Sequence, residues 1–427
     1  MAWVWSVPVG GVMGGPDELM RLLVPQYIHN HGTLPTGYDS EAIYGTYYWS
    51  YAFYPQFLGP IISALFMGIV GLVHNTPHAL DLAARLTSVL FAVGTVAVVG
   101  LITRKLFEKN SYKEIYMYAA MILVAAWPQF AFLAGYVNND IIALFGVSVI
   151  IYACLLGLKD NWNYKNSLLL AVGFIVCILG YVNSYGFVLF GGLFFIASLV
   201  MQNQAVKKIW IMIGVVAITT LVVAGPFFIR NAVIYNGDFL GMRTFKERSI
   251  EGERDNGGNS QQTYAEVVKR SSATIFVDKQ YITNQSESFI ARFGAMNIRP
   301  SNSQILIYEI FIIVGGLGLL WMLFAYRKKI LTQANRQKLF YGIFILLGSI
   351  TTIGLSIYYT LAIDYQPQGR YIIYLLAPLI VFGFYGLIFA FNKIFVKRYQ
   401  IAALSIFILL YGFNSLFLFK QYIMPLN

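Results

Sequence analysis

Two adjacent carboxylates stand near the start of a chain whose other residues are mostly apolar. Asp17 and Glu18 lie in the stretch "GGPDELMRLLVPQYIHNHGTLP", where the nearest basic residue is Arg21. A carboxylate partly shielded from water can act as a general base and remove a proton from an attacking hydroxyl. The alternative is structural: Asp17 would cap a helix that begins after Pro16, since acids are favoured at a helix N-terminus. The two interpretations are compatible, because a helix start also fixes the acid in place.

A third acid follows a pair of asparagines in "YVNNDIIALF". Asp140 is placed to cap the helix predicted from the apolar run that follows it. Its alternative role is chemical: Asp140, together with Asn139, would act as a second acid that orients an acceptor, a sugar or a metal ion. The sequence leaves both roles open.

Two arginines lie where apolar runs end or begin. Arg230 closes "PFFIR", and Arg370 precedes Tyr371 in "QGRYIIYLLAPL". The structural explanation is snorkelling, in which the charged head reaches the membrane surface. The chemical explanation is phosphate binding, because a guanidinium group offers a planar fork of donors that matches phosphate oxygens. We therefore assign Arg370, Arg230 and Tyr371 to a candidate site for a lipid phosphate.

The composition is that of an integral membrane protein. Of the 427 residues, 58% are hydrophobic and only 11% are charged, and the mean hydropathy is +0.64. Soluble domains carry about 25% charged residues. The net charge of +11 is explained by basic loops that stay on the cytoplasmic side of a membrane, and no basic patch lies on a soluble domain. We therefore expect no nucleic-acid partner.

Apolar runs predict an all-α polytopic protein with about eleven transmembrane helices. The first run, Met1–Met13, is too short to cross about 30 Å of hydrocarbon, and Phe57–Val73 is ambiguous because Pro60 lies near its start. The remaining predicted spans are Leu82–Ile102, Ile115–Ala134, Ile141–Leu158, Ser167–Tyr181, Tyr185–Met201, Ile209–Ile229, Ile305–Tyr326, Leu339–Ile363, Tyr371–Phe391 and Ile401–Phe419.

The charges of the connecting loops predict the orientation. Basic connectors such as "TRKLFEKNSYKE", "QNQAVKK" and "YRKKILTQANRQK" alternate with "GYVNND", "GYVNS", residues 230–304 and "DYQPQGR". The basic set is cytoplasmic, so Asp140, Arg230 and Arg370 lie outside. Asp17 lies on the same side if Phe57–Val73 rests in the interface, as the flanking aromatic residues favour. We predict one domain, 1–427, with two long extracytoplasmic segments, 14–80 and 230–304.

Five segments together resemble the GT-C superfamily of integral membrane glycosyltransferases. More closely, the chain is similar to a bacterial branch catalogued as a membrane domain of unknown function. The segments occur in the family's order and cover nearly the whole chain; they are "PDELMRLLVPQYIHNHGTLP", "YVNNDIIALF", "PFFIRNAVIYNGDFLG", "SFIARFGAMN" and "QGRYIIYLLAPL". The resemblance implies a bacterial, multi-pass protein with amphipathic helices in its first outer loop.

The resemblance also implies a reaction. A monosaccharide would move from a polyprenyl-phosphate donor to a hydroxyl acceptor on the extracytoplasmic side, with inversion. The family's first-loop acids fall on Asp17 and Glu18, with Asp17 as general base, and its "GRY" arginine falls on Arg370, near the donor phosphate. Relatives often have histidine three residues after the Glu, whereas this chain has Arg21, so the role of that histidine cannot be transferred.

A further family element, "RN…YG", falls on Arg230, Asn231 and Tyr235, although Asn236 intervenes before Gly237. The resemblance therefore also assigns these three residues to the outer face.

We expect no obligatory cofactor or metal. Asp17, Glu18 and Asp140 could nevertheless supply oxygen ligands to Mg²⁺ or Mn²⁺. The expected partners are a polyprenyl-phosphate-linked sugar, a glycan acceptor such as a teichoic-acid-like polymer of the cell surface, and the lipid bilayer. Two alternatives stay open: a flippase or exporter of lipid-linked saccharides, and a glycan polymerase or ligase.

Overall fold

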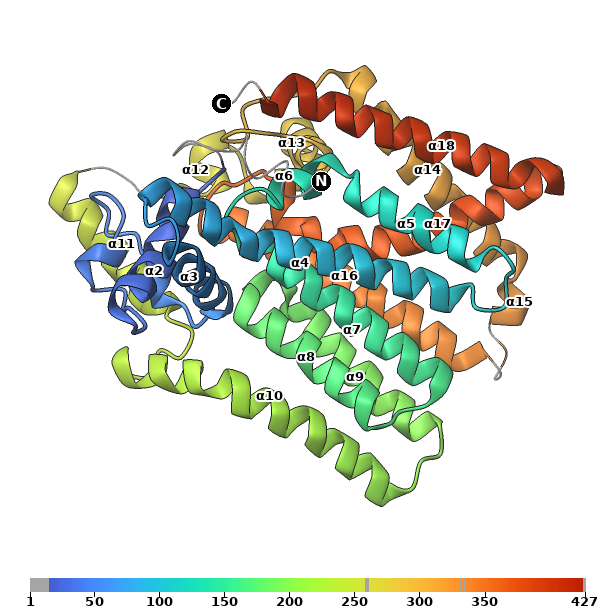
Figure 1. Ribbon diagram of the computed structural model, residues 1–427, viewed down its shortest axis with the longest axis horizontal. Coiled ribbons are helices and arrows are strands. Elements are labelled where there is room, and N and C mark those ends of the chain that lie inside the picture. Colours follow the sequence, from blue (N-terminus) through green and yellow to red (C-terminus); the bar gives the residue numbers. More distant parts are fainter. Residues whose placement is uncertain (1–14, 258–260, 331, 333–334, 425–427) are drawn as a thin grey trace.

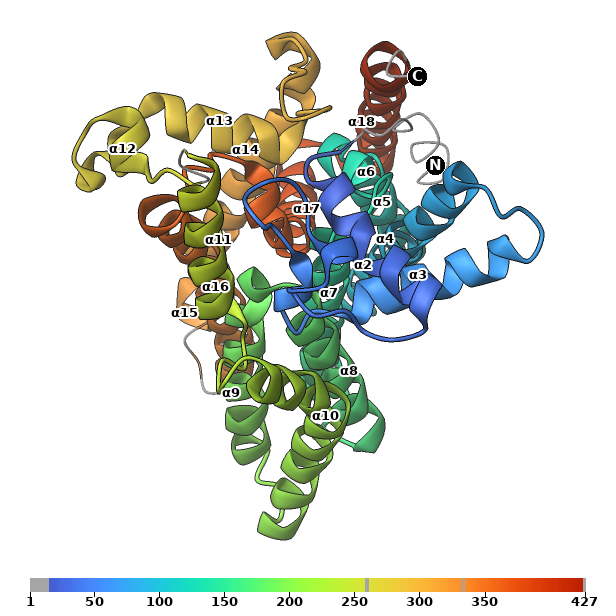
Figure 2. The ribbon, with the colours of Figure 1, turned by 90° about the vertical axis from the view of Figure 1, so that its left-hand side faces the viewer.

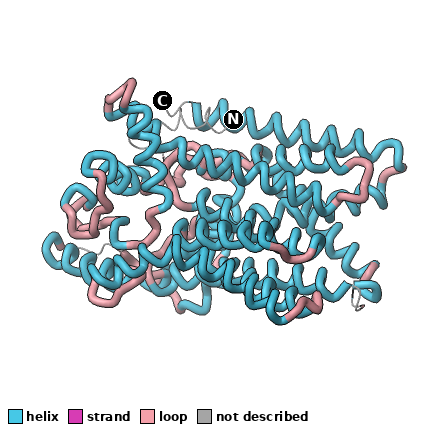
Figure 3. The backbone as a smooth tube through the Cα atoms, turned by 60° about the horizontal axis from the view of Figure 1, so that its bottom comes forward, coloured by secondary structure: helices cyan, strands magenta, loops and turns pink. Residues whose placement is uncertain are grey.

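The described part of the chain is built almost entirely of helices. The computed structural model describes residues 15–257, 261–330, 332 and 335–424, so the predicted short span Met1–Met13 lies outside it. Within these ranges there is no β-strand, only two isolated bridges, Tyr44 with Trp49 and Phe293 with Ile298. Figure 3 shows helices throughout, joined by short loops. The predicted all-α fold is confirmed.

Eight helical segments of the described ranges are long and apolar enough to cross a membrane. They are Pro77–Leu106 (α4), Asp140–Asp160 (α7), Val182–Met201 (η3 and α9), Val206–Ile234 (α10), Asn302–Ala325 (α14), Arg336–Ala362 (α16), Gly369–Ile394 (η6 and α17) and Arg398–Ile423 (α18 and η7). The chain is thus a multi-pass membrane protein, as expected. Tyr164–Gly180 (α8) is a shorter apolar helix.

One predicted span is broken. The run Ile115–Ala134 forms two helices, Lys113–Ala125 (α5) and Pro128–Leu133 (α6). The break falls at Trp127, whose backbone is extended (φ −73°, ψ 116°) because it precedes Pro128. The proline then occupies the first turn of α6, where a missing N–H costs little.

The core of the bundle is organised around α7. This helix is almost completely buried and packs against α4, α8, α9, α16, α17 and η6. On another side, α14 and α17 cross closely through small residues: a Cβ atom on Gly386 would lie 2.0 Å from the carbonyl oxygen of Gly315. Close crossing at glycines is a common way for membrane helices to pack.

The helices of the first loop and of the 230–304 segment gather at one end of the bundle, which is the left-hand end in Figure 1. These elements are Glu18–His31 (α2), Ser40–Ala42 (η1), Tyr51–Phe53 (η2), Leu58–Gly71 (α3), Met242–Asn256 (α11), Tyr264–Val268 (α12), Ser272–Val277 (η4) and Lys279–Ile290 (α13). The opposite end holds short connectors and Arg327–Ile330 (α15).

The ambiguous apolar run forms α3, which lies across this end of the bundle. Figure 1 shows α3 almost end-on, and the rotated view in Figure 2 shows it from the side, in front of the long helices. It packs against α2 and α4, and the Ser63 hydroxyl donates to the Ala84 carbonyl oxygen near the start of α4 (3.1 Å). α2 and α3 therefore lie at the end that also carries the long segment 230–304.

Candidate active site

Asp17 stands at the start of α2 but does not cap it. Its backbone is left-handed (φ 61°) and its side chain makes no capping hydrogen bond. Instead its Oδ2 accepts a hydrogen bond from Nη2 of Arg370 at 2.6 Å. The two residues are 353 positions apart in the sequence, so the fold brings together the predicted base and the predicted phosphate-binding arginine. Left-handed backbone is uncommon for residues other than glycine and often marks functional positions.

Arg370 is buried and held from several directions. Its Nη1 donates to the carbonyl oxygen of Pro16 (3.4 Å), and its Nη2 also donates to the Tyr371 hydroxyl (3.0 Å). The preceding Gly369 N–H donates to the hydroxyl of Ser288 on α13 (2.6 Å). A Cβ on Gly369 would lie only 2.1 Å from the backbone nitrogen of Phe289, so this close contact requires glycine.

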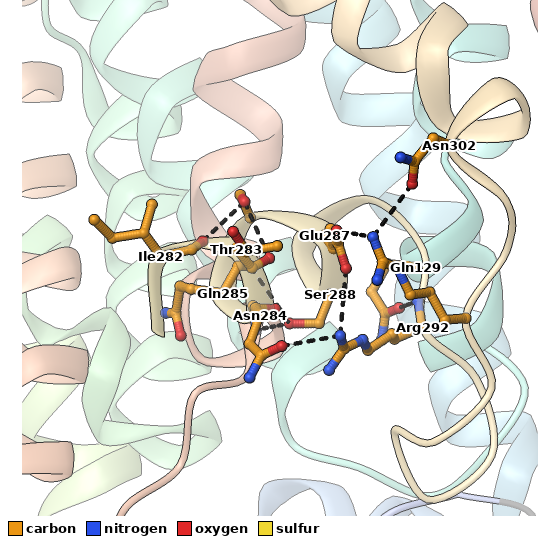
Figure 4. Close-up of polar contacts among 12 residues, drawn as sticks. Gln129, Ile282, Thr283, Asn284, Gln285, Glu287, Ser288, Arg292 and Asn302 are labelled. Atoms are coloured by element: carbon orange, nitrogen blue, oxygen red, sulfur yellow. Dashed lines mark hydrogen bonds and ion pairs between the residues drawn. The ribbon is translucent and has the colours of Figure 1, made fainter. Parts of the chain in front are cut away.

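A polar cluster at the end of α13 fixes the helix that supports Arg370. Glu287 pairs with Arg292 (3.3 Å) and with Arg299, and Figure 4 shows Glu287 facing Arg292. The N–H of Arg292 donates to the side-chain oxygen of Gln129 on α6 (2.8 Å). The cluster therefore ties α13 to α6, and through Ser288 it ties α6 to the segment that carries Arg370.

Glu18 faces away from Arg370 and pairs with Arg85 on α4. Nε and Nη2 of Arg85 donate to its two carboxylate oxygens at 2.8 Å and 2.9 Å. The N–H of Val137 donates to Glu18 Oε1 (3.0 Å), and both charged side chains are at least 95% buried. This bidentate pair joins α2, α4 and the loop before α7, and it therefore fixes the position of the neighbouring Asp17.

Asp140 lies at the first turn of α7 and accepts a hydrogen bond from the Tyr374 hydroxyl at 2.8 Å. It is 1% exposed. The capping bond comes from Asn138, whose side-chain oxygen accepts from the Ile141 N–H (3.1 Å). Asn138 and Asn139 line the cavity that Asp17 also lines, whereas the next residue, Asp140, does not line it.

Arg230 makes its contacts with the first loop and does not line this cavity. Its Nη2 donates to the carbonyl oxygens of Leu34 (3.2 Å) and Pro35 (2.7 Å). The adjacent Asn231 donates to the Phe53 carbonyl (2.8 Å), and the hydroxyl of Tyr235 bonds the Gly37 N–H and the Ala52 carbonyl oxygen. The predicted "RN…Y" element thus clamps the loop that follows α2 onto the end of α10.

One cavity collects the remaining candidates. It has a volume of about 150 Å³. Four of the predicted or resemblance-derived positions, Asp17, Asn139, Arg370 and Tyr371, line it. The other walls include two charged side chains, Arg21 and Asp364, and a set of aromatic and amide side chains, among them Trp49, Tyr51, Tyr54, Tyr181, Tyr359, Gln56, Asn138, Asn183 and Gln366. Such walls can stack on sugar rings and hydrogen-bond to hydroxyl groups.

The surroundings of Asp17 keep it ionised. Burial alone would raise the pKa of its carboxyl group, but the charges of Arg370 and Arg21 and the hydrogen bond from Arg370 outweigh burial and lower the pKa. The Asp17 side chain is still 26% exposed. An ionised acid that is reachable from the cavity fits a proton acceptor.

Sequence reasoning overlooked two arginines that lack an obvious motif: Arg85, which pairs with Glu18, and Arg21, which lines the cavity. Arg85 lies in the apolar run of α4. A single arginine in such a run does not reveal which acid it pairs with. Arg21 was noted as the nearest basic residue and as a departure from the family pattern but was given no role, yet it lines the cavity one helical turn beyond Asp17. Its spacing of four residues from Asp17 was the available signal, because residues four apart share one face of a helix.

Solved structures of other proteins have folds similar to that of this chain. ArnT from Cupriavidus metallidurans, in the apo state, is 12% identical with a TM-score of 0.53, over 99% of this chain and 71% of that one. The Archaeoglobus fulgidus oligosaccharyltransferase, in the apo form, is 15% identical with a TM-score of 0.55, over 97% of this chain and 55% of that one. This chain therefore spans just over half the length of the oligosaccharyltransferase.

A third structure, the archaeal oligosaccharyltransferase AglB from Archaeoglobus fulgidus, holds an inhibitory peptide and a dolichol-phosphate. It is 16% identical with a TM-score of 0.51, over 100% of this chain and 54% of that one. No protein-family model and no curated protein matches the sequence. ArnT and AglB are GT-C glycosyltransferases, so the expected similarity is confirmed at the level of fold: the chain has the fold of GT-C membrane glycosyltransferases.

Proposed function

We propose that this protein is a membrane glycosyltransferase that moves a monosaccharide from a polyprenyl-phosphate donor to a hydroxyl acceptor. The observation that carries the proposal is the contact of Asp17 with Arg370 in one cavity, 2.6 Å apart and at the end of the bundle that bears the two long segments. A proton acceptor beside a phosphate-binding group is what glycosyl transfer from a lipid phosphate requires.

In the proposed reaction, the acceptor oxygen attacks the anomeric carbon of the sugar from the side opposite the phosphate. The bond between that carbon and the phosphate oxygen breaks, and the phosphate keeps the electron pair. Asp17 takes the acceptor proton, and Arg370, with the Tyr371 hydroxyl, stabilises the charge that grows on the leaving phosphate. A single displacement of this kind inverts the anomeric centre. Holding both reactants in line supplies much of the rate.

In this scheme, the ion pair between Asp17 and Arg370 belongs to the enzyme before the donor binds. Arg370 spends one of its donors on Asp17 and one on the Pro16 carbonyl oxygen. A donor phosphate that shares Arg370 would weaken the hold on Asp17 and raise its basicity. The base would then become effective only when the donor is bound, which limits unproductive proton transfer.

The fold relatives support the donor class. AglB is bound to a dolichol-phosphate in its solved complex, so a related fold accommodates a polyprenyl-type phosphate lipid. For this chain we infer an extracytoplasmic active site in a bacterial membrane and a cell-surface glycan as acceptor. We keep Asp140 and Asn139 as candidates for orienting the acceptor, because Asn139 lines the cavity and Asp140 is the buried residue next to it in the chain. A divalent cation is not required by this scheme.

A flippase or exporter of lipid-linked saccharides is the alternative, and a direct comparison separates the two. Purified protein in lipid nanodiscs is given polyprenyl-phosphate sugars labelled in the sugar, with extracts of cell-surface glycan as acceptor. The candidate acceptors and sugars are first identified by comparing the envelope glycans of cells with and without the protein. Transfer of label to glycan supports the proposal, whereas movement of intact labelled lipid across a liposome bilayer without transfer would support the alternative.

A further inference from the structure

A second buried cation lies beside Asp17 on α2. Arg21 is four residues further along, and its N–H donates to the Asp17 carbonyl oxygen (3.0 Å), so both side chains leave the same face of the helix. The Arg21 side chain is 6% exposed and lines the cavity together with Asp17 and Arg370. Its guanidinium carbon lies 4.2 Å above the ring centre of Tyr51 and 5.9 Å from that of Tyr181.

Arg21 differs from the other buried arginines in what it binds. Arg85 is satisfied by both oxygens of Glu18, and Arg370 by Asp17, Pro16 and Tyr371. Among the residues that the structure describes, by contrast, none accepts a hydrogen bond from the Arg21 side chain; the buried Nε atoms of Arg21 and Arg370 both lack a partner, but the Nη atoms of Arg370 are bonded. The rings of Tyr51 and Tyr181 lie against this charge, and the Asp17 carboxylate is near enough to interact with it electrostatically but makes no hydrogen bond to it.

A buried charge without a hydrogen-bonding partner is costly, and proteins normally pair it. Cation–π contacts recover only part of that cost. The position of α2 is also fixed, because the neighbouring Glu18 is locked to Arg85, so Arg21 cannot easily turn out of the cavity. The arrangement is typical of a site whose missing partner is an anionic ligand.

We propose that Arg21 is a second phosphate-binding arginine, which together with Arg370 forms a two-armed clamp for the phosphate of a polyprenyl-linked ligand. The inference rests on the proposed function and extends it to a residue that the family comparison left without a role. Arg21 and Arg370 line one cavity with Asp17 and Asp364; Arg370 is bonded to Asp17, whereas the Arg21 side chain has no hydrogen-bond acceptor, and a phosphate supplies one that matches a guanidinium better than a neutral sugar does. Tyr51 would hold the Arg21 fork in its binding orientation.

Binding of a sugar-free lipid tests the clamp independently of turnover. Full-length protein in nanodiscs is titrated with polyprenyl phosphate, with the corresponding polyprenol, and with inorganic phosphate. The variants are Arg21→Met, which keeps length and removes charge, and Arg21→Lys, which keeps the charge and loses the fork. Arg243→Met is the matched control, because Arg243 is an exposed arginine on α11, at the same end of the protein but outside the cavity.

We expect Arg21→Met to weaken polyprenyl-phosphate binding by about tenfold or more, as for loss of a charge-assisted hydrogen bond. Arg21→Lys should fall between wild type and Arg21→Met, polyprenol binding should not change, and Arg243→Met should bind like wild type. Without ligand, Arg21→Met should melt at the same or a higher temperature than wild type, because an unpaired buried charge is removed. A purely structural arginine would instead lower the melting temperature.

The contrary results separate the two proposals. If wild-type protein binds polyprenyl phosphate and both Arg21 variants bind it equally well, the clamp is wrong while the proposed function stands. If the variants weaken polyprenol binding as much as polyprenyl-phosphate binding, Arg21 affects binding of the lipid chain and does not bind the phosphate, and the clamp is wrong. If wild-type protein binds no polyprenyl phosphate, both proposals fail. Binding of inorganic phosphate that matches the lipid would identify a free phosphate as the ligand and overturn the lipid assignment.

Discussion

Replacing Gly369 with alanine should disable the site without touching any charged group. The Cβ of an alanine would lie 2.1 Å from the backbone nitrogen of Phe289 and 2.4 Å from its Cα. Since contacts under 3.0 Å are essentially never seen for real Cβ atoms, the segment must move by about 0.9 Å or more, the difference between 3.0 and 2.1 Å. Backbone lies on both sides of this contact, so a side-chain rotation cannot relieve it.

The displacement should pass directly to the next residue, Arg370. A misplacement of about 1 Å in a catalytic group can cost about a hundredfold in rate, and overpacking typically costs about 1–3 kcal/mol of stability. We therefore expect Gly369→Ala to lower the sugar-transfer rate by about two orders of magnitude. The assay is transfer of labelled sugar from polyprenyl phosphate by protein purified in nanodiscs, with the amount of folded protein fixed by size-exclusion chromatography.

Gly316→Ala is the matched control, because a Cβ at this position of α14 meets nothing within 4 Å. It should transfer sugar at the wild-type rate and be equally or slightly more stable, since alanine is the better helix former. Wild-type transfer by Gly369→Ala would refute the argument that α13 positions Arg370. Loss of transfer by both variants would show that the bundle is sensitive to any added methyl group.

Two further predictions concern the acids. Glu18→Gln should lower the free energy of unfolding by about 1–3 kcal/mol, because it removes the charge from the paired hydrogen bonds that Glu18 accepts from Arg85, and thermal unfolding measures this. Asp160→Asn, at an exposed ion pair, should change the free energy of unfolding by less than about 1 kcal/mol. At low donor concentration the transfer rate reports the free enzyme and should stay level on acidification to about pH 4, because the pKa of Asp17 in the free enzyme is lowered from the usual aspartate value near 3.9; a steep loss between about pH 7 and pH 5 would contradict this.

The sequence predicted the fold well, because its strongest signals are long apolar runs and the charges between them. The same signals placed Asp17, Asp140, Arg230 and Arg370 at one end of the protein. The break at Trp127 was missed because an apolar run hides a proline-induced turn. The partner of Glu18 was missed because hydropathy does not reveal which arginine of a transmembrane helix pairs with an acid 67 positions away.

The different roles of the candidate residues could be assigned only from the three-dimensional structure. Asp17 and Glu18 are adjacent in sequence, yet one faces the cavity and the other faces α4. A helix turns about 100° per residue, so neighbours must diverge, but the direction of each depends on what packs around α2. Arg230 and Arg370 look equivalent as interfacial arginines, and only their contacts separate a loop clamp from a cavity residue.

In the proposed reaction Asp17 is the proton acceptor, in a cavity where Arg370 binds the donor phosphate. The most direct measurement is the turnover of Asp17→Asn together with its affinity for polyprenyl phosphate, in one nanodisc preparation. Asparagine tolerates the left-handed backbone at this position, so the fold is kept. We predict that turnover falls by about 10²–10⁴-fold, while affinity is unchanged or higher because Arg370 loses a competing carboxylate. Wild-type turnover in this variant would contradict the account.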